Sequence, residues 1–275
     1  MNFECCEIEK NHTLYDIIVL DIGFASETSS NCGLVIKQVN QIDTYQLNFN
    51  NAFIKTYEHI KTGNNDIILI LEAPLSVHYE NYCPSPRSGT FLNGTIWKEK
   101  NAWFTPIGMS ILGGAHAFLK LLYQKDFYDN SEEMLTNSNK KIYLYEALSS
   151  QKNDPLFCVN KKESIKNLAS KLLTTVGATG GQGTEELIKT INRKVRINDW
   201  IDALGIYYAF MNSNDSKWVK IERFDPEKNK GKKFQYSVFE YFSINKNIEN
   251  AEINPFSIPS VLSVGWEEIW GLMNN

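Results

Sequence analysis

Two acidic residues stand at the ends of apolar runs, where their side chains could do chemistry. Asp21 follows the run 17–20, and Glu72 follows the run 67–71. Continuous apolar runs of this length are typical of strands buried on both faces. An ionised carboxylate beside buried structure is costly unless a cation or hydrogen-bond donors meet it. Each acid can simply form a turn at a strand end, but a divalent metal ion would give both a common role.

A second pair of acids, Asp199 and Asp202, opens the strongest helical pattern in the chain, 198–210. Residues three apart project from one face of a helix about one turn apart. Acids in a first turn are also favoured by the helix dipole, which is the simpler explanation of the pair. That explanation leaves the apolar remainder of the face unaccounted for. Two acids on a largely buried face require cations.

The histidines, the cysteines and a further acid indicate a site with oxygen ligands and not a zinc site. A third apolar strand, 142–146, also ends in an acid, Glu146. The four histidines have no histidine or cysteine three or four residues away, and the five cysteines are scattered without a Cys-x-x-Cys pair. Neither a zinc site nor a disulfide framework is indicated. Carboxylates without histidine are the ligand set that Mg²⁺ prefers.

The elements that must position these acids predict an α/β fold with a mixed sheet flanked by helices. Three strands joined by short turns form an antiparallel meander, and helices then alternate with strands. A glycine-rich segment, 177–184, lacks the Lys-Ser/Thr ending of a phosphate-binding loop and is interpreted as a flexible hinge. The expected strands are 16–23, 33–39, 43–49, 66–72 and 142–146, and the expected helices are 52–63, 107–124, 164–176 and 198–210.

The organisation predicted is a domain over 14–212 and a C-terminal extension over 213–275. The extension is expected to hold a strand pair, 217–225 and 234–243, and a terminal helix, 260–273. Trp266 and Trp270 of that helix either close the core or form a docking surface for a second copy or a partner protein.

Composition is that of an ordinary globular protein, with 43% hydrophobic and 22% charged residues among 275. The chain has no apolar run of the ~20 residues that span a membrane, and its acidic start does not resemble a signal peptide. A cytoplasmic location without membrane contact is expected.

The charge distribution leaves room for nucleic acid on one face. The net charge of −4 argues against wholesale wrapping of a polyanion, but 151–196 carries a local charge of +5 and 217–235 one of +4. The lysines of these segments can equally lie on solvated helix faces. The loop 76–106 mixes aromatic with basic side chains, which can stack on bases and contact phosphates, or pack on the core as a flap. The candidate nucleic-acid ligands are Arg87, Trp97, Lys98, Lys100, Trp103, Arg193, Lys194 and Arg196.

The order of the elements resembles the ribonuclease H-like fold, and the placement of the acids is similar to that of RuvC-like nucleases. The last helix of those nucleases carries the Asp-x-x-Asp-Ala-Leu string found here at 199–204. The segments 72–75 and 145–147 also resemble those of uncharacterised bacterial families predicted to be ribonuclease H-fold nucleases. The resemblance covers about residues 16–212. The chain lacks the proline that many resolvases have after the first acid, so junction resolution is not supported.

The resemblance implies a nuclease that hydrolyses phosphodiester bonds of DNA or RNA with two Mg²⁺ or Mn²⁺ ions. It implies that Asp21 bridges both ions, that Glu72 binds one, and that Asp199 or Asp202 binds the other. Glu146 is either a fifth ligand or an anchor for a neighbouring loop. Two alternatives stay open: an actin-like phosphotransferase or ATPase, whose first strand also ends in Asp-x-Gly, and a non-catalytic nucleic-acid-binding subunit of a larger complex.

Overall fold

A computed structural model describes most of the predicted core. The described residues are 15–23, 31–73, 76–80, 83–84, 106–123, 142–150, 162–178, 180–191, 199–212, 218–220, 234–237 and 260–265. Among the helices of these ranges, none has both the length and the apolar character needed to cross a bilayer.

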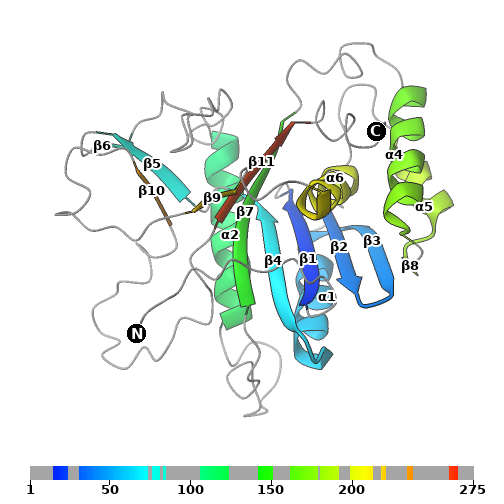
Figure 1. Ribbon diagram of the computed structural model, residues 1–275, viewed down its shortest axis with the longest axis horizontal. Helices are drawn as coiled ribbons and strands as arrows, with labels where there is room; N and C mark the ends of the chain where they lie inside the picture. The colour runs from blue at the N-terminus through cyan, green and yellow to red at the C-terminus, as the bar shows by residue number, and fades with distance from the viewer. Residues whose placement is uncertain are drawn as a thin grey trace.

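The fold is α/β, built on a mixed sheet with the strand order β8-β3-β2-β1-β4-β7-β11-β9 (Figure 1). A smaller sheet has the order β10-β5-β6. The strands of the large sheet are β1 (Tyr15–Ile22), β2 (Cys32–Gln38), β3 (Gln41–Leu47), β4 (Asp66–Glu72), β7 (Ile142–Ser150), β8 (Gly180–Gly181), β9 (Trp218–Lys220) and β11 (Ser260–Gly265). Those of the small sheet are β5 (Ser76–Glu80), β6 (Cys83–Pro84) and β10 (Phe234–Ser237).

The centre of the large sheet follows from the apolar runs. β1 pairs antiparallel with β2, and β2 antiparallel with β3. β1, β4 and β7 are parallel neighbours, so their connections must cross over a face of the sheet. Because helices cover both faces, β1 and β4 are apolar at nearly every position rather than at alternate ones.

Helices form a layer on each side of the sheet (Figure 1). On one side, α1 (Phe49–Thr62) and α2 (Pro106–Tyr123) pack against Ile18, Leu20 and other residues of the same parity. On the other side, α4 (Lys162–Val176), α5 (Thr184–Thr190) and α6 (Asp199–Asn212) pack against Ile17, Val19 and their neighbours. Alternation along each strand therefore decides which helical layer a side chain meets.

The mixed α/β class is confirmed, and so are the predicted elements up to α6, within a few residues at their ends. α1 illustrates the local signals. It begins after Asn48, whose side chain accepts a hydrogen bond from the backbone N–H of Asn51, and ends at Gly63. One boundary differs: β7 continues to Ser150, so Glu146 lies within the strand and not at its end.

Three expectations are wrong. Residues 260–265 of the expected terminal helix form β11, which pairs with β7 and β9 in the large sheet. The expected strands 217–225 and 234–243 contain β9 and β10, but these join different sheets and do not pair with each other. The expected hinge contains β8, which adds to β3. Each error concerns a partner far away in sequence, which local patterns do not specify. Trp266 and Trp270 lie outside the described residues.

Candidate metal centre

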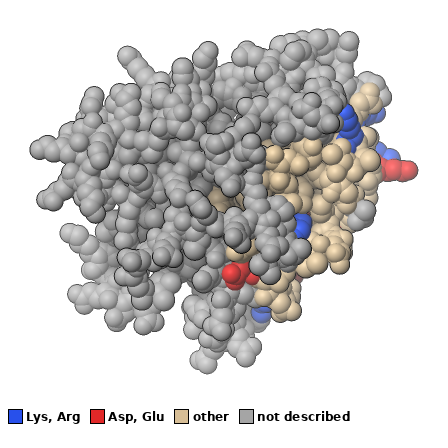
Figure 2. Space-filling model, in the orientation of Figure 1, with Lys and Arg blue, Asp and Glu red and all other residues tan. Residues whose placement is uncertain are grey.

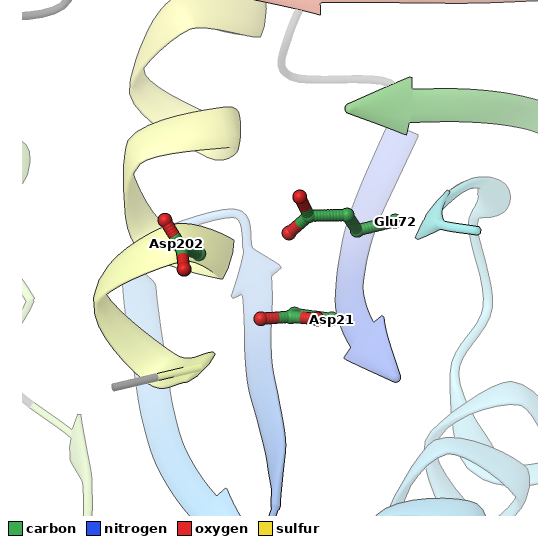
Figure 3. Close-up of side chains that lie close together, drawn as sticks. All are labelled: Asp21, Glu72 and Asp202. Carbon is green, nitrogen blue, oxygen red and sulfur yellow. The ribbon is translucent and has the colours of Figure 1, made fainter. Parts of the chain in front are cut away.

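Three acids from three different elements meet at one end of the large sheet. Among the described residues, Asp21, Glu72 and Asp202 each offer a carboxylate oxygen, and these oxygens lie within 4.8 Å of one another. Figure 3 shows the side chains of Asp21 on β1 and Glu72 on β4 directed toward Asp202 on α6. Glu72 and Asp202 are buried, and Asp21 is partly exposed.

Strand register brings the first two acids together. Asp21 pairs with Glu72 at the last position of the parallel β1–β4 ladder. Both share parity with residues that pack beneath α6, such as Val19 and Ile70. Parallel strands end at the same edge of a sheet, so acids at both ends project together on the α6 side. The sequence predicted both residues because each one ends an apolar strand, but their register follows only from the structure.

The start of α6 lies directly on β2. A Cβ atom built on Gly33 would overlap the carbonyl of Asp199 and the backbone nitrogen of Trp200. Gly33 is also the register partner of Asp21. A residue without a side chain at this position therefore lets the first turn of the helix reach the acids of the sheet.

The two acids of α6 have different surroundings. Asp202 belongs to the group of three, whereas Asp199 Oδ2 accepts a hydrogen bond from Gln46 Nε2 at 2.9 Å. Asp199 still lies near enough to Asp21 to raise the pKa of that residue. The structure thus brings Asp202 to Asp21 and Glu72, and it places Asp199 beside this group.

Among the acids of the site, Asp21 has a raised pKa. Burial raises its pKa well above the ordinary value of 3.8, and the nearby carboxylates of Glu72, Asp199 and Asp202 raise it further. Burial also raises the pKa of the Cys32 thiol to about 12, and its Sγ–H donates to the carbonyl of Gly23 at 3.6 Å. Clustered carboxylates that disfavour one another's ionised form are stabilised by a shared cation.

The structure does not test the remaining predicted ligands. Backbone register pairs Glu146 with Leu71, while Ala147 is the partner of Glu72. The side chain of Glu146 lies outside the described residues, so both of its proposed roles stay predictions. All the candidate nucleic-acid ligands, from Arg87 to Arg196, also lie outside them. On the described part of the face in Figure 2, lysine side chains form separate patches among mostly uncharged surface.

A different acid of β1 takes part in a separate polar network. Asp16 lies near the start of the strand, and its carboxylate contacts His59 Nε2 at 2.9 Å and accepts from Asn65 Nδ2 at 3.0 Å. Gln38 Nε2 lies 3.3 Å from the other ring nitrogen of His59. This network, in which Asp16 and His59 are buried, joins β1, β2 and α1 at the opposite end of β1 from Asp21. Position along one strand thus separates a structural acid from a candidate ligand.

Sequence reasoning missed Gly33 and Gln46, which contact the start of α6. Neither belongs to a local motif, and their contacts with Asp199 join residues more than 150 positions apart. No known protein family model, curated protein or solved structure matches the chain.

Proposed function

We propose that the chain is a Mg²⁺- or Mn²⁺-dependent nuclease that hydrolyses phosphodiester bonds of DNA or RNA. The observation that carries the proposal is the convergence of Asp21, Glu72 and Asp202 within 4.8 Å. These residues come from two strands and a helix, so the convergence is a product of the fold and not of one acidic segment.

The donor set fits a hard divalent cation. Its ligands are carboxylate oxygens, which Mg²⁺ and Mn²⁺ prefer over the nitrogen and sulfur ligands of zinc sites. The raised pKa of Asp21 also favours a bound cation, because a cation among the three acids would offset burial and like-charge repulsion. Asp21, Glu72 and Asp202 would hold the ion, with Asp199 as the neighbouring ligand for a second.

When bound, divalent ions activate water and stabilise the charge that develops on a phosphodiester in hydrolysis. The protein's own part is to hold the carboxylates in place. Glu72 and Asp202 are buried and Asp21 is partly exposed, so a substrate would reach the acids past Asp21. A phosphate group can reach the acids only with its negative charge offset, which makes the ion necessary for substrate binding as well.

The arrangement of elements supports a ribonuclease H-like interpretation of the fold. The antiparallel β1-β2-β3 meander, followed by β4 and β7 parallel to β1, retains the element order on which the resemblance rests. The acids of β1, β4 and α6 keep the order expected for RuvC-like nucleases. These features favour a nuclease over the actin-like alternative, which requires a second similar half.

The test is cleavage of labelled single- and double-stranded DNA and RNA with Mg²⁺, with Mn²⁺ and with EDTA. We expect metal-dependent cleavage that is lost in Asp21→Asn, Glu72→Gln and Asp202→Asn. Asp43→Asn changes a β3 acid outside the group of three and should cleave like the wild type. Equal cleavage by Asp21→Asn and the wild type would refute the proposal. Metal-independent binding without cleavage would favour the non-catalytic subunit, and ATP binding would favour the actin-like phosphotransferase.

A further inference from the structure

We propose that Gln46 is a positioning residue of the metal centre: its side-chain amide seats the first turn of α6 so that the acids of the helix meet those of the sheet. The inference rests on the proposed metal site but assigns a role to a residue outside the ligand set. Gln46 lies on β3 and is 8% exposed.

The amide of Gln46 makes two opposite contacts with α6. Its Oε1 accepts the backbone N–H of Trp200 at 3.0 Å, and its Nε2 donates to Asp199 Oδ2 at 2.9 Å. The orientation of the amide follows from these partners, because the backbone N–H can only donate and therefore requires the oxygen. The nitrogen then faces the carboxylate.

Both functions of the amide are needed. The first N–H groups of a helix have no partner within the helix, and Gln46 supplies one from a distant strand. The same side chain fixes the carboxylate of Asp199, one turn before Asp202. A glutamate at this position would lose the donor and place a second charge against Asp199. A methionine would keep the length and lose both hydrogen bonds.

Gln46 is itself held from a third direction. Its backbone N–H donates to Gln182 Oε1 at 2.7 Å, and the backbone N–H of Gln182 donates to the carbonyl of Thr44 at 3.0 Å. Across the sheet, Gln46 pairs with Gly33, and Gly33 pairs with Asp21, which pairs with Glu72. Four residues that are neighbours across adjacent strands therefore include Gln46 and Gly33, which contact α6, and two of the acids.

The experiment is calorimetric titration of the full chain with Mn²⁺, well below the unfolding temperature. We expect Gln46→Glu and Gln46→Met to bind Mn²⁺ at least about tenfold more weakly than the wild type, as loss of an outer-shell contact to a metal ligand typically does. The matched control is Gln41→Glu on the same strand: Gln41 is exposed, and its Nε2 also donates to an aspartate, Asp43 Oδ1 at 2.7 Å. This control should bind like the wild type.

A double-mutant cycle separates positioning from general stability. In Asp199→Asn, the amide of residue 199 can donate to a glutamate at 46, so Gln46→Glu should weaken Mn²⁺ binding much less in that background than in the wild type. A purely structural role would lower the unfolding temperature in EDTA and leave the affinity of the folded protein unchanged.

Wild-type affinity in both Gln46 variants would overturn the inference while leaving the metal site intact. A wild-type chain that binds no Mn²⁺ would overturn both the inference and the proposed function. Weakened binding in the Gln46 variants of a chain that cleaves no nucleic acid would support the inference and refute the nuclease.

Discussion

At the scale of single residues, β1 contains two aspartates with opposite roles. Asp16 is buried and accepts hydrogen bonds from His59 and Asn65, whereas Asp21 lies among like charges near the opposite end of the strand. Both are acids beside the same apolar run, so the sequence does not distinguish them by their immediate neighbours. Their partners from other elements make the distinction.

Exchange of each aspartate for asparagine should separate these roles. Asp21→Asn removes a repelled charge, so metal-free protein should be as stable as the wild type or more so, while Mn²⁺ binding and the proposed cleavage fall on the order of 100-fold or more. Asp16→Asn should bind Mn²⁺ normally and unfold about 1–2 kcal/mol more easily, because His59 and Asn65 lose a charged acceptor. Calorimetric titration and urea unfolding in EDTA measure the two effects. Loss of Mn²⁺ binding in the single variant Asp16→Asn would contradict the different roles given to the two aspartates.

The raised pKa of Asp21 predicts how stability depends on pH without metal. The carboxyl of folded Asp21 titrates above its ordinary value of 3.8, so the folded state holds more protons than the unfolded chain between these two pKa values. This residue's contribution to the free energy of unfolding therefore falls as pH rises through that window.

Urea unfolding in EDTA from about pH 4 to pH 8 tests the direction of this effect. The difference in stability between the wild type and Asp21→Asn should grow in favour of the variant as pH rises. Saturating Mn²⁺ should reverse the order, because the ion binds the folded wild type. A difference that does not change with pH in EDTA would contradict the assignment.

At the scale of elements, the close packing of α6 on β2 requires a glycine at position 33. Alanine there would force apart two backbones in contact, so Gly33→Ala should lower the free energy of unfolding by about 2 kcal/mol or more and weaken Mn²⁺ binding. Gly113 on α2 is the matched control, since a Cβ there meets nothing within 4 Å. Gly113→Ala should stabilise the protein by about 0.5–1 kcal/mol through helix propensity. Urea unfolding measures both changes in stability. An equal effect at the two sites would contradict the requirement for Gly33 in the packing of α6 on β2.

The elements also show what local sequence can and cannot predict. The buried strands β1 and β4, the amphipathic α4 and the start of α6 follow from periodicity and composition, and with them the positions of Asp21, Glu72 and Asp202. The apolar residues of β11 predicted a helix, and only the pairing with β7 and β9 shows that they form a strand. The roles of Gly33 and Gln46 depend on a helix far along the chain, and their own neighbours carry no sign of it.

At the scale of the whole molecule, the C-terminal segment completes the large sheet. β11 covers the edge of β7 that faces away from β4, and β9 in turn covers β11. A chain ended after residue 212 would leave the edge of β7 open, and open edges promote association between chains. A chain ended after residue 265 keeps β9 and β11 and serves as the control.

We expect the 1–212 protein to self-associate or precipitate and the 1–265 protein to behave like the full chain. Size-exclusion chromatography with light scattering measures the association, and amide exchange of β7 measures the loss of its cover. A monodisperse 1–212 protein with protected β7 amides would show that the sheet does not depend on its last strands.

The contact between Gln46 and Asp199 spans 153 positions, which has a consequence for how the site is made. β1 and β4 can pair as soon as the first quarter of the chain is available, but α6 docks only after a much longer loop has closed. During synthesis on the ribosome, the acids of the sheet are therefore in place long before Asp202 emerges. The capacity to hold a metal ion arises late, and its return in a refolding experiment would mark the docking of α6.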